Sequence, residues 1–287
     1  MRVIYLTVAL AMFAGTALAQ DSNAGVLVPV EAGQVWYQTC GSGPKAVVLI
    51  HDSVLHSATW DDVWPILCRE FHVVRYDRRG VGRSPAATAS YSPVDDLTAV
   101  MRATAIEHAV VVGSSSGSGL AVDFTLQHPT AVDRLVLVGP WVSGFAVSQH
   151  FIDQATTMVE HLTKGDIDGA LRGYRWAFAP GHDAARKKAI GVLASNPQDI
   201  PHDIHDSDLV RHAPLAKPLL ASISVPTLIL VGEYDIADVQ AQVGALEALI
   251  SRSKRIVLPD AGHLMYLEQP DAFAKLVAEF ANGPLAQ

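Results

Sequence analysis

The chain has 287 residues, of which 49% are hydrophobic, and it carries a formal net charge of −8 at pH 7. This length allows one large domain with a substantial buried core. The acidic balance disfavours binding to nucleic acid and to anionic membrane surfaces. We therefore expect no nucleic-acid partner and no stable membrane partner, while the sequence carries no signal for an oligomeric state.

The N-terminus has the pattern of a targeting segment. Arg2 precedes an apolar run, Val3–Leu18, and the small residues Ala17 and Ala19 stand at the positions that a signal peptidase reads. The run is shorter than the about 20 apolar residues of a membrane span, which makes an uncleaved anchor the weaker alternative. The first 19 residues are predicted to be a cleaved signal peptide. The mature chain, starting at Gln20, has 20 Lys and Arg against 29 Asp and Glu and is expected to be periplasmic or secreted.

Apolar segments of strand length alternate with segments of helical spacing along most of the chain. The expected strands are Val26–Val30, Gln34–Thr39, Ala46–His51, Phe71–Tyr76, Ala109–Val112, Arg134–Val138, Pro226–Val231 and Arg255–Leu258. The expected helices are Trp60–Arg69, one capped by Ser92 that buries Val94, Leu97, Met101 and Ala105, one from Ser116 to the stop at His128, one ending at Ile250, and a last one burying Phe273, Leu276, Val277 and Phe280. This alternation predicts an α/β fold with a mostly parallel sheet covered by helices on both faces. Ligands of such sheets bind at the carboxyl ends of the strands.

The alternation breaks between residues 141 and 222, where no valine-rich strand appears. This segment is predicted to be a mostly helical cap, inserted between two parts of the core, residues 20–140 and 223–287. It supplies apolar surface to roof a pocket, and Trp141 and Phe145 are the expected substrate contacts. Most of the other large apolar side chains are expected to pack the cap onto the core; these side chains include Phe151, Met158, Trp176 and Phe178.

A Gly-x-Ser-x-Gly pattern lies between the strand that ends at Val112 and the helix that follows. Gly113 and Gly117 stand two residues from Ser115 on either side, as a sharp strand-to-helix turn requires. Such a turn lifts the Ser115 hydroxyl above the sheet and aims the Ser116 N–H at an oxyanion formed there. The alternative is a loop rich in serine and glycine that carries no chemistry. Ser115 is therefore the candidate nucleophile.

A serine nucleophile needs a histidine base that a carboxylate orients. Asp235 and then His263 follow the nucleophile, each just beyond a predicted strand, in the order expected for this kind of turn. Asp238 is the main rival for the acid, while Asp260 is too close to His263 in sequence to orient it well. A surface histidine and a helix-capping aspartate are the alternatives. The second oxyanion donor is predicted to be the backbone N–H of Ser53, after the central strand.

Five segments of the chain together match the motifs of a known protein family. They are His51 to Trp60, Tyr76 to Ser84, Gly113-x-Ser115-x-Gly117, Gly232-x-x-Asp235, and Ala261-Gly262-His263 with Glu268-Gln269-Pro270. In these segments the chain resembles the α/β-hydrolase superfamily, over nearly the whole mature chain. It is most similar to capped members that include esterases, enol-lactonases, cofactor-free haloperoxidases and carbon–carbon bond hydrolases. The resemblance implies a serine hydrolase that uses no cofactor. Serine at position 115 disfavours the dehalogenases and epoxide hydrolases of this fold, which have aspartate there.

The chain departs from the superfamily pattern beside the predicted oxyanion hole. Many members have His-Gly where this chain has His51-Asp52. If the Asp52 carboxylate faced the pocket, it would oppose developing negative charge unless it were protonated or paired. If it faced away, it would bond a backbone group or an arginine.

Two cysteines, Cys40 and Cys68, belong to the exported part of the chain. An oxidising compartment allows a disulfide between them, at the sheet edge opposite the nucleophile turn, and two separate buried thiols are the alternative. In the cap, His202 and His205 have a spacing that can place them on one face. Clustered His and Asp residues in a loop are usually solvated, so we expect no metal.

The leading hypothesis from the sequence is an exported serine hydrolase that cleaves a small-molecule carboxylic ester or lactone through an acyl-enzyme. A carbon–carbon bond hydrolase or cofactor-free haloperoxidase with the same Ser-His-Asp triad is the rival within the fold. A ligand-binding or sensor protein with little turnover is the alternative from another class, and Asp52 is its main motivation.

Overall fold

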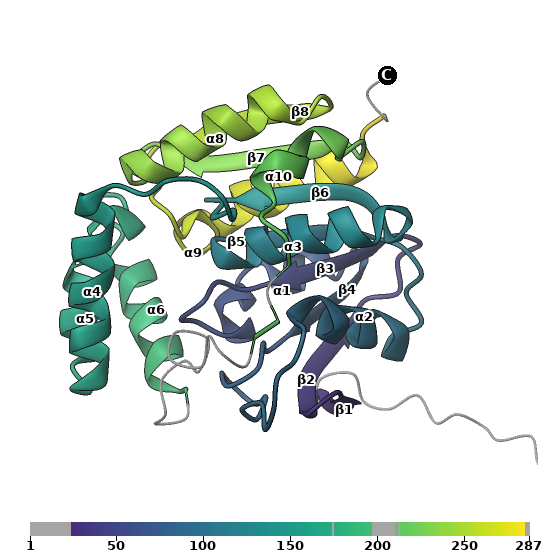
Figure 1. Cartoon of the computed structure of the whole chain (residues 1–287), viewed down its shortest axis with the longest axis horizontal. Coiled ribbons are helices and arrows are strands. Elements are labelled where there is room, and N and C mark those ends of the chain that lie inside the picture. The colour runs from purple at the N-terminus through teal and green to yellow at the C-terminus, as the bar shows by residue number, and fades with distance from the viewer. Residues whose placement is uncertain (1–23, 174, 197–209, 212, 285–287) are drawn as a thin grey trace, which may run out of the picture.

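The computed structural model describes residues 24–173, 175–196, 210–211 and 213–284. Eight strands form one sheet in the order β1-β2-β4-β3-β5-β6-β7-β8 (Figure 1). The strands are β1 (Val26–Val30), β2 (Gly33–Cys40), β3 (Ala46–Ile50), β4 (His72–Tyr76), β5 (Ala109–Ser114), β6 (Val132–Val138), β7 (Thr227–Gly232) and β8 (Ser253–Leu258). The predicted signal peptide and the pair His202 and His205 lie outside the described residues.

The sheet is mostly parallel, as predicted. Strands β4, β3, β5, β6, β7 and β8 pair in parallel, and only β1 with β2 and β2 with β4 pair antiparallel within the described residues. Along β3, Val47 and Leu49 pack into one hydrophobic core while Val48 and Ile50 pack into a second. Successive side chains of a strand point to opposite faces, so the sheet is covered on both sides.

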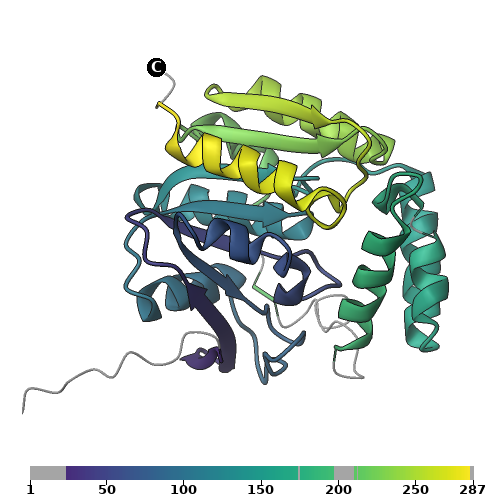
Figure 2. The same ribbon diagram turned by 180° about the vertical axis from the view of Figure 1, so that it is seen from behind.

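Helices divide between the two faces of the sheet. The front face in Figure 1 carries α2 (Pro93–Ala103), α3 (Ser116–Gln127) and α8 (Ala237–Leu249). The opposite face, in front in Figure 2, carries α1 (Trp64–Leu67), α9 (Met265–Glu268) and α10 (Pro270–Asn282). Ser92 caps α2 as predicted, because its Oγ accepts the Asp95 N–H at 3.2 Å.

Two helices differ in detail from the predicted ones. The segment after β3 forms a 3-10 turn, Ser57–Trp60, and then the short helix α1, in place of one helix through Arg69. Pro65 sits in the first turn of α1, a position that proline tolerates, and would break a longer helix. Helix α2 ends before Ala105, which has φ 53° and is exposed, so Ile106 takes the buried place predicted for Ala105.

Helices α4 (Gln149–Thr163), α5 (Ile167–Gly173) and α6 (Asp183–Ala194) follow β6 in the segment where we predict the cap. Helix α5 packs against both α4 and α6, and the three helices stand together at one end of the sheet in both views (Figures 1 and 2). Among the helices that the structure describes, none has the length and apolar character to cross a membrane.

The topology reverses direction next to β3. This strand has β4 on one side and β5 on the other, so the loops that leave β3 and β5 lie at adjacent carboxyl ends. Open α/β sheets bind ligands at such a switch point. The fold thereby brings the loop that contains Asp52 next to the turn that contains Ser115.

A disulfide joins Cys40, the last residue of β2, to Cys68 at the end of α1, with the two Cα atoms 5.5 Å apart. Both cysteines are engaged in it, so the two separate thiols left open by the sequence do not occur. Cys40 pairs with Val73 near the start of β4, which places the bridge at the amino ends of the parallel strands. The bridge therefore lies at the sheet edge opposite Ser115.

Removing this bridge should destabilise the protein without touching the site. For a separation of 28 residues, the restriction of the unfolded chain corresponds to about 3.5 kcal/mol of unfolding free energy. We expect the Cys40→Ala/Cys68→Ala double variant to lose that amount in urea unfolding, and wild-type protein to lose it when reductant is added. Reductant should not affect the double variant. Equal stability of oxidised and reduced wild-type protein would contradict this prediction.

Candidate active site

The turn that joins β5 to α3 holds Ser115 in a strained backbone conformation. Its φ of 53° and ψ of −119° lie in a region that residues other than glycine rarely adopt. The Ser115 N–H donates to the Val138 carbonyl at 2.8 Å. A Cβ added at Gly113 would lie 2.3 Å from the Gly117 carbonyl oxygen, and one at Gly117 would lie 2.4 Å from that of His51. The close approach therefore requires glycine at both positions flanking Ser115.

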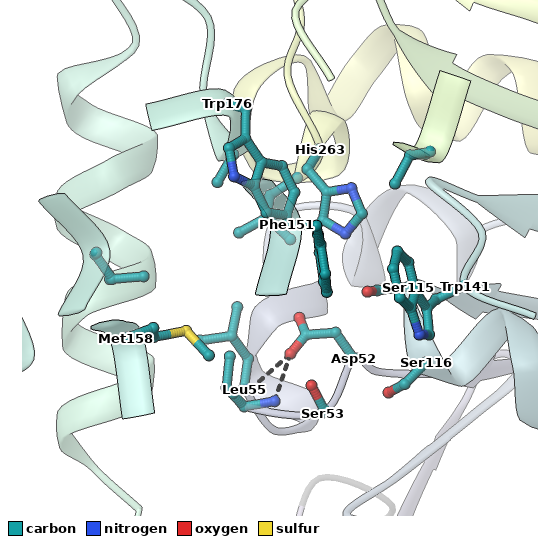
Figure 3. A pocket seen from close by; sticks show the side chains of 15 residues that line it. Asp52, Ser53, Leu55, Ser115, Ser116, Trp141, Phe151, Met158, Trp176 and His263 are labelled. Atoms are coloured by element: carbon teal, nitrogen blue, oxygen red, sulfur yellow. Dashed lines mark hydrogen bonds between the residues drawn. The ribbon is translucent and has the colours of Figure 1, made fainter. Parts of the chain in front are cut away.

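The neighbouring strands β7 and β8 bring Asp235 and His263 together. The imidazole Nδ1 lies 2.9 Å from Asp235 Oδ2 and 3.0 Å from Oδ1. Both side chains are buried. Since a carboxylate only accepts hydrogen bonds, Nδ1 carries the proton and Nε2 has the free lone pair. Figure 3 shows the His263 ring at the wall of the cavity that Ser115 also lines.

The two rival aspartates have other partners. Asp238 accepts the Ser148 N–H at 2.6 Å and the Ser148 hydroxyl at 2.7 Å, at the start of α4. Asp260 is exposed and lies 3.4 Å from His182. The geometry thus pairs His263 with Asp235, while Asp238 attaches the cap helix α4 to the start of α8.

Contacts to the cap segment hold the loop that carries His263. The His263 N–H donates to the Trp176 carbonyl at 3.2 Å. The Glu268 carboxylate accepts the Ala179 N–H at 2.6 Å on the cap side and the Gly262 N–H at 2.7 Å on the loop side. Burial raises the pKa of Glu268 despite these two hydrogen bonds. The position of His263 therefore depends on how the cap docks.

Carboxylates around His263 favour its charged form. Burial acts to lower the pKa of His263, but the charge and hydrogen bond of Asp235 and the charges of Asp52 and Glu268 raise it above its ordinary value overall. These groups stabilise the imidazolium that forms when the ring accepts a proton.

His51 and Arg78 brace the loop after β3. The His51 Nδ1–H donates to the Asp52 carbonyl at 2.6 Å, and Nε2 accepts the Arg78 N–H at 2.8 Å. Burial and the charge of Arg78 hold the pKa of His51 well below its ordinary value, so the ring is neutral. The Arg78 guanidinium donates to Ser116 Oγ at 2.9 Å and to the Asp52 carbonyl at 3.4 Å. One arginine thus links this loop to the start of α3.

Ser53 and Ser116, the predicted oxyanion donors, both line the cavity beside Ser115. Within the described part of the chain, the Ser53 N–H has no hydrogen-bond acceptor. Ser116 is the first residue of α3, so its N–H has no partner within the helix. Two backbone N–H groups of this kind are able to bind an oxyanion.

The sequence left open whether the Asp52 carboxylate faces the pocket or bonds a backbone group, and the structure shows both. Its Oδ1 accepts the N–H groups of Val54 and Leu55 at 2.8 Å each, and its Oδ2 accepts the Tyr266 hydroxyl at 3.3 Å. The carboxylate also lines the cavity (Figure 3). Burial, with the charge of Asp52, raises the pKa of Tyr266 well above its ordinary value, so the phenol keeps the proton that it donates.

A cavity of about 130 Å³ lies between the core and the cap. Three aromatic side chains form one wall of it: the Trp141 and Phe151 rings stack at 4.2 Å, and Phe151 and Trp176 lie 6.3 Å apart. The Trp176 and His263 rings are nearly perpendicular, with their centroids 4.8 Å apart. The remaining apolar lining consists of Val54, Leu55, Met158, Leu171, Ala177, Val239 and Leu264.

Of the two predicted substrate contacts, Trp141 lines this cavity and Phe145 does not. Gly144, with φ 92°, turns the chain toward Lys217, and the Phe145 ring packs beneath the Lys217 ammonium at 4.7 Å. Phe145 as a substrate contact therefore stays a prediction, and its ring packs against Lys217 instead of lining this cavity.

Three further lining residues, Phe151, Met158 and Trp176, belong to the large apolar cap side chains, most of which are expected to pack the cap onto the core. They come from α4 and from the short turn Arg175–Ala177. The sequence signal for them was the clustering of large apolar side chains in the cap. Which of these side chains face the cavity depends on the docking of the cap helices, which local periodicity does not define.

No group of three or more His, Cys, Asp or Glu side chains in the described residues could hold a metal ion. The residues considered for such a site in the sequence, His202 and His205, lie outside the described part of the chain.

The family model of the alpha/beta hydrolase family matches residues 47–276. The chain belongs to this family. A pimeloyl-[acyl-carrier protein] methyl ester esterase of Edwardsiella ictaluri is 26% identical over 256 residues, covering 87% of this chain and 98% of that protein. A 2-hydroxy-6-oxo-6-(2'-aminophenyl)hexa-2,4-dienoic acid hydrolase of Metapseudomonas resinovorans is 26% identical over 267 residues, covering 86% of this chain and 87% of that protein.

Among solved structures, the N-acyl homoserine lactone degrading enzyme Est816 is similar, with a TM-score of 0.73 and 26% identity, covering 89% of this chain and 100% of that one. These findings confirm the predicted superfamily and fold. Like these relatives, the chain is a hydrolase.

The carboxylates around His263 lead to a prediction about the pKa of this histidine. We expect Asp235→Asn and Asp52→Asn each to lower the pKa of His263, because each removes a negative charge that favours the imidazolium. Histidine NMR signals followed against pH would measure this. Asp133→Asn is the matched control: Asp133 lies 2.7 Å from His108 and raises the pKa of that residue, so His108 should move and His263 should not. A His263 pKa unchanged in both variants would refute the arrangement.

Proposed function

We propose that this hydrolase cleaves a carboxylic ester or lactone through an acyl-enzyme, with Ser115 as nucleophile, His263 as base and Asp235 as the group that orients His263. The observation that carries the proposal is the convergence of three features on one cavity: the strained Ser115 turn, the His263–Asp235 contact at 2.9 Å, and two backbone N–H groups beside the serine. The esterase and lactone-degrading relatives support the same reaction class.

In the proposed mechanism each of these groups has one step. As His263 Nε2 takes the hydroxyl proton, Ser115 Oγ bonds to the carbonyl carbon, and the carbonyl oxygen becomes an oxyanion that the Ser53 and Ser116 N–H groups bind. Collapse of this intermediate breaks the bond to the alcohol oxygen, which receives the proton from His263. Water then attacks the acyl group on Ser115 by the same route and releases the acid. Throughout these steps Asp235 accepts the hydrogen bond from the His263 Nδ1–H and so keeps the ring in its orientation.

A carbon–carbon bond hydrolase using the same triad is the second candidate, and the Metapseudomonas resinovorans relative supports it. That relative is named for a carboxylic acid substrate. In this chain the cavity is lined by the Asp52 carboxylate and, within the described residues, by no lysine or arginine. Because like charges repel in a buried site, an anionic substrate fits this cavity poorly, and we favour the ester or lactone.

Ser115→Ala tests the nucleophile. We expect kcat on short-chain 4-nitrophenyl esters to fall by a factor of about 10⁴ or more, because the acyl-enzyme can no longer form. The melting temperature should be retained, since alanine fits the same turn. A fluorophosphonate should label wild-type protein at Ser115 and leave the variant unlabelled, while Ser116→Ala, which keeps its backbone N–H, should still be labelled. Turnover surviving in Ser115→Ala would exclude the assignment.

We further propose that the chain is exported to the periplasm or beyond after cleavage before Gln20. The apolar run behind Arg2 and the Cys40–Cys68 disulfide support this, since structural disulfides persist in oxidising compartments.

Expression of the full chain in a bacterium with a periplasm tests the export proposal. We expect the periplasmic fraction to contain protein whose intact mass corresponds to a chain starting at Gln20, with no free thiol. Ala19→Arg should block cleavage and leave the precursor with the membranes. A full-length, reduced protein in the cytoplasmic fraction would argue against export.

A further inference from the structure

The cavity contains a carboxylate, Asp52, that makes and breaks no bond in the proposed reaction. Asp52 is 4% exposed, yet its carboxylate lines the same cavity as Ser115 and His263. Its Oδ1 is occupied by the Val54 and Leu55 N–H groups, whereas Oδ2 accepts only the Tyr266 hydroxyl, at 3.3 Å, within the described residues. A carboxylate oxygen accepts two hydrogen bonds, so Oδ2 retains capacity toward the cavity.

Fixed donors hold this carboxylate in place. The backbone N–H groups of Val54 and Leu55 lie in the same loop as Asp52, and Tyr266 is fully buried and packs against Trp60 with ring centroids 4.2 Å apart. Rotation of Asp52 away from the cavity would leave these buried donors without their acceptor, which is costly. These donors therefore keep the Asp52 carboxylate at the cavity wall.

The rest of the wall suits a cation. Trp141, Phe151 and Trp176 form a connected aromatic surface, and the faces of aromatic rings attract ammonium groups. The Arg78 guanidinium donates to Ser116 Oγ and to the Asp52 carbonyl, and Arg78 is not among the lining residues. A carboxylate beside aromatic rings, with no lysine or arginine among the described lining residues, matches the chemistry of an alkylammonium group.

We propose that the physiological substrate class is an ester or lactone that carries an ammonium group, primary or quaternary, and that Asp52 is the residue that selects it. The inference rests on the proposed ester hydrolysis, and it specifies in addition that the substrate is positively charged. Asp52 binds the ammonium, the aromatic wall contacts its alkyl substituents, and the carbonyl lies between Ser115 and the oxyanion donors. An anionic acyl or alcohol group is rejected by the same carboxylate.

Three activated esters of matched length test the selection. They are the 4-nitrophenyl esters of 4-(trimethylammonio)butanoic acid, of its neutral isostere 5,5-dimethylhexanoic acid, and of glutaric acid as the anionic monoester. We expect wild-type kcat/KM to be about tenfold higher for the cationic than for the neutral ester, and lower still for the anionic one. The cationic ester is intrinsically more electrophilic, so the deciding quantity is the change in this ratio between protein variants.

Asp52→Asn should reduce the cationic-to-neutral ratio by about tenfold, since asparagine keeps the acceptor oxygen and removes the charge. The ratio compares two esters on the same protein, so a change in the fraction of active protein cancels in it. Asp133→Asn removes a surface charge and should leave the ratio as in wild type, which separates local binding from long-range attraction. If Asp52→Asn fails to fold, Phe151→Leu, which alters the aromatic wall, should lower the ratio in the same direction. A ratio unchanged by both cavity variants would overturn the proposal.

A binding measurement separates this inference from the proposed function. In Ser115→Ala, which is not expected to turn over, choline should bind more tightly than its neutral isostere 3,3-dimethylbutan-1-ol by calorimetry, and the preference should disappear when Asp52→Asn is added. If none of the three esters is hydrolysed and choline still binds, the proposed hydrolysis fails while the cation site stands. If all three are hydrolysed with equal efficiency and choline does not bind, the hydrolysis stands and the cation site fails.

Discussion

The close packing of two glycine backbones around Ser115 is the constraint on which the site depends. A left-handed backbone at a serine costs about 1 to 3 kcal/mol, and it persists only where the surrounding structure leaves no alternative. Here Gly113 approaches the Gly117 carbonyl, and Gly117 approaches the loop after β3 at His51. The same contacts that force the strain bring the Ser116 N–H and that loop to the serine. The proposed nucleophile and the proposed oxyanion donors are therefore positioned by a single packing arrangement.

His263, the proposed base, is positioned differently, because the cap segment takes part in holding it. The His263 N–H binds the Trp176 carbonyl, and Glu268 spans from the His263 loop to the Ala179 N–H. Trp176 also forms part of the cavity wall and contacts the His263 ring. Any displacement of the cap would thus change the pocket shape and the position of the imidazole together. Substrate selection and proton transfer are coupled through these few contacts.

The sequence was sufficient to predict the structure of those segments whose conformation depends on their own residues. Continuous apolar runs predicted the buried strands, and the glycines around Ser115 predicted the turn, because only a narrow range of residues is compatible with either. It was insufficient to predict side-chain orientations that depend on tertiary packing. Helical spacing did not show which cap side chains face inward, so Phe145 was predicted in place of Phe151. The orientation of Asp52 also depended on distant donors, since its partner Tyr266 comes from α9, 214 residues later.

The Asp52 carboxylate acts in opposite directions on the two charges of the proposed reaction. It stabilises the His263 imidazolium, and it opposes the oxyanion that forms beside Ser53 and Ser116. For a neutral substrate the second effect opposes the reaction, and the burial of Asp52 strengthens it. A bound ammonium group would neutralise Asp52 as the substrate enters and so remove the repulsion on the oxyanion. The same contact would then lower the barrier of the chemical step as well as anchor the substrate, and the charge preference should appear in kcat and not in KM alone.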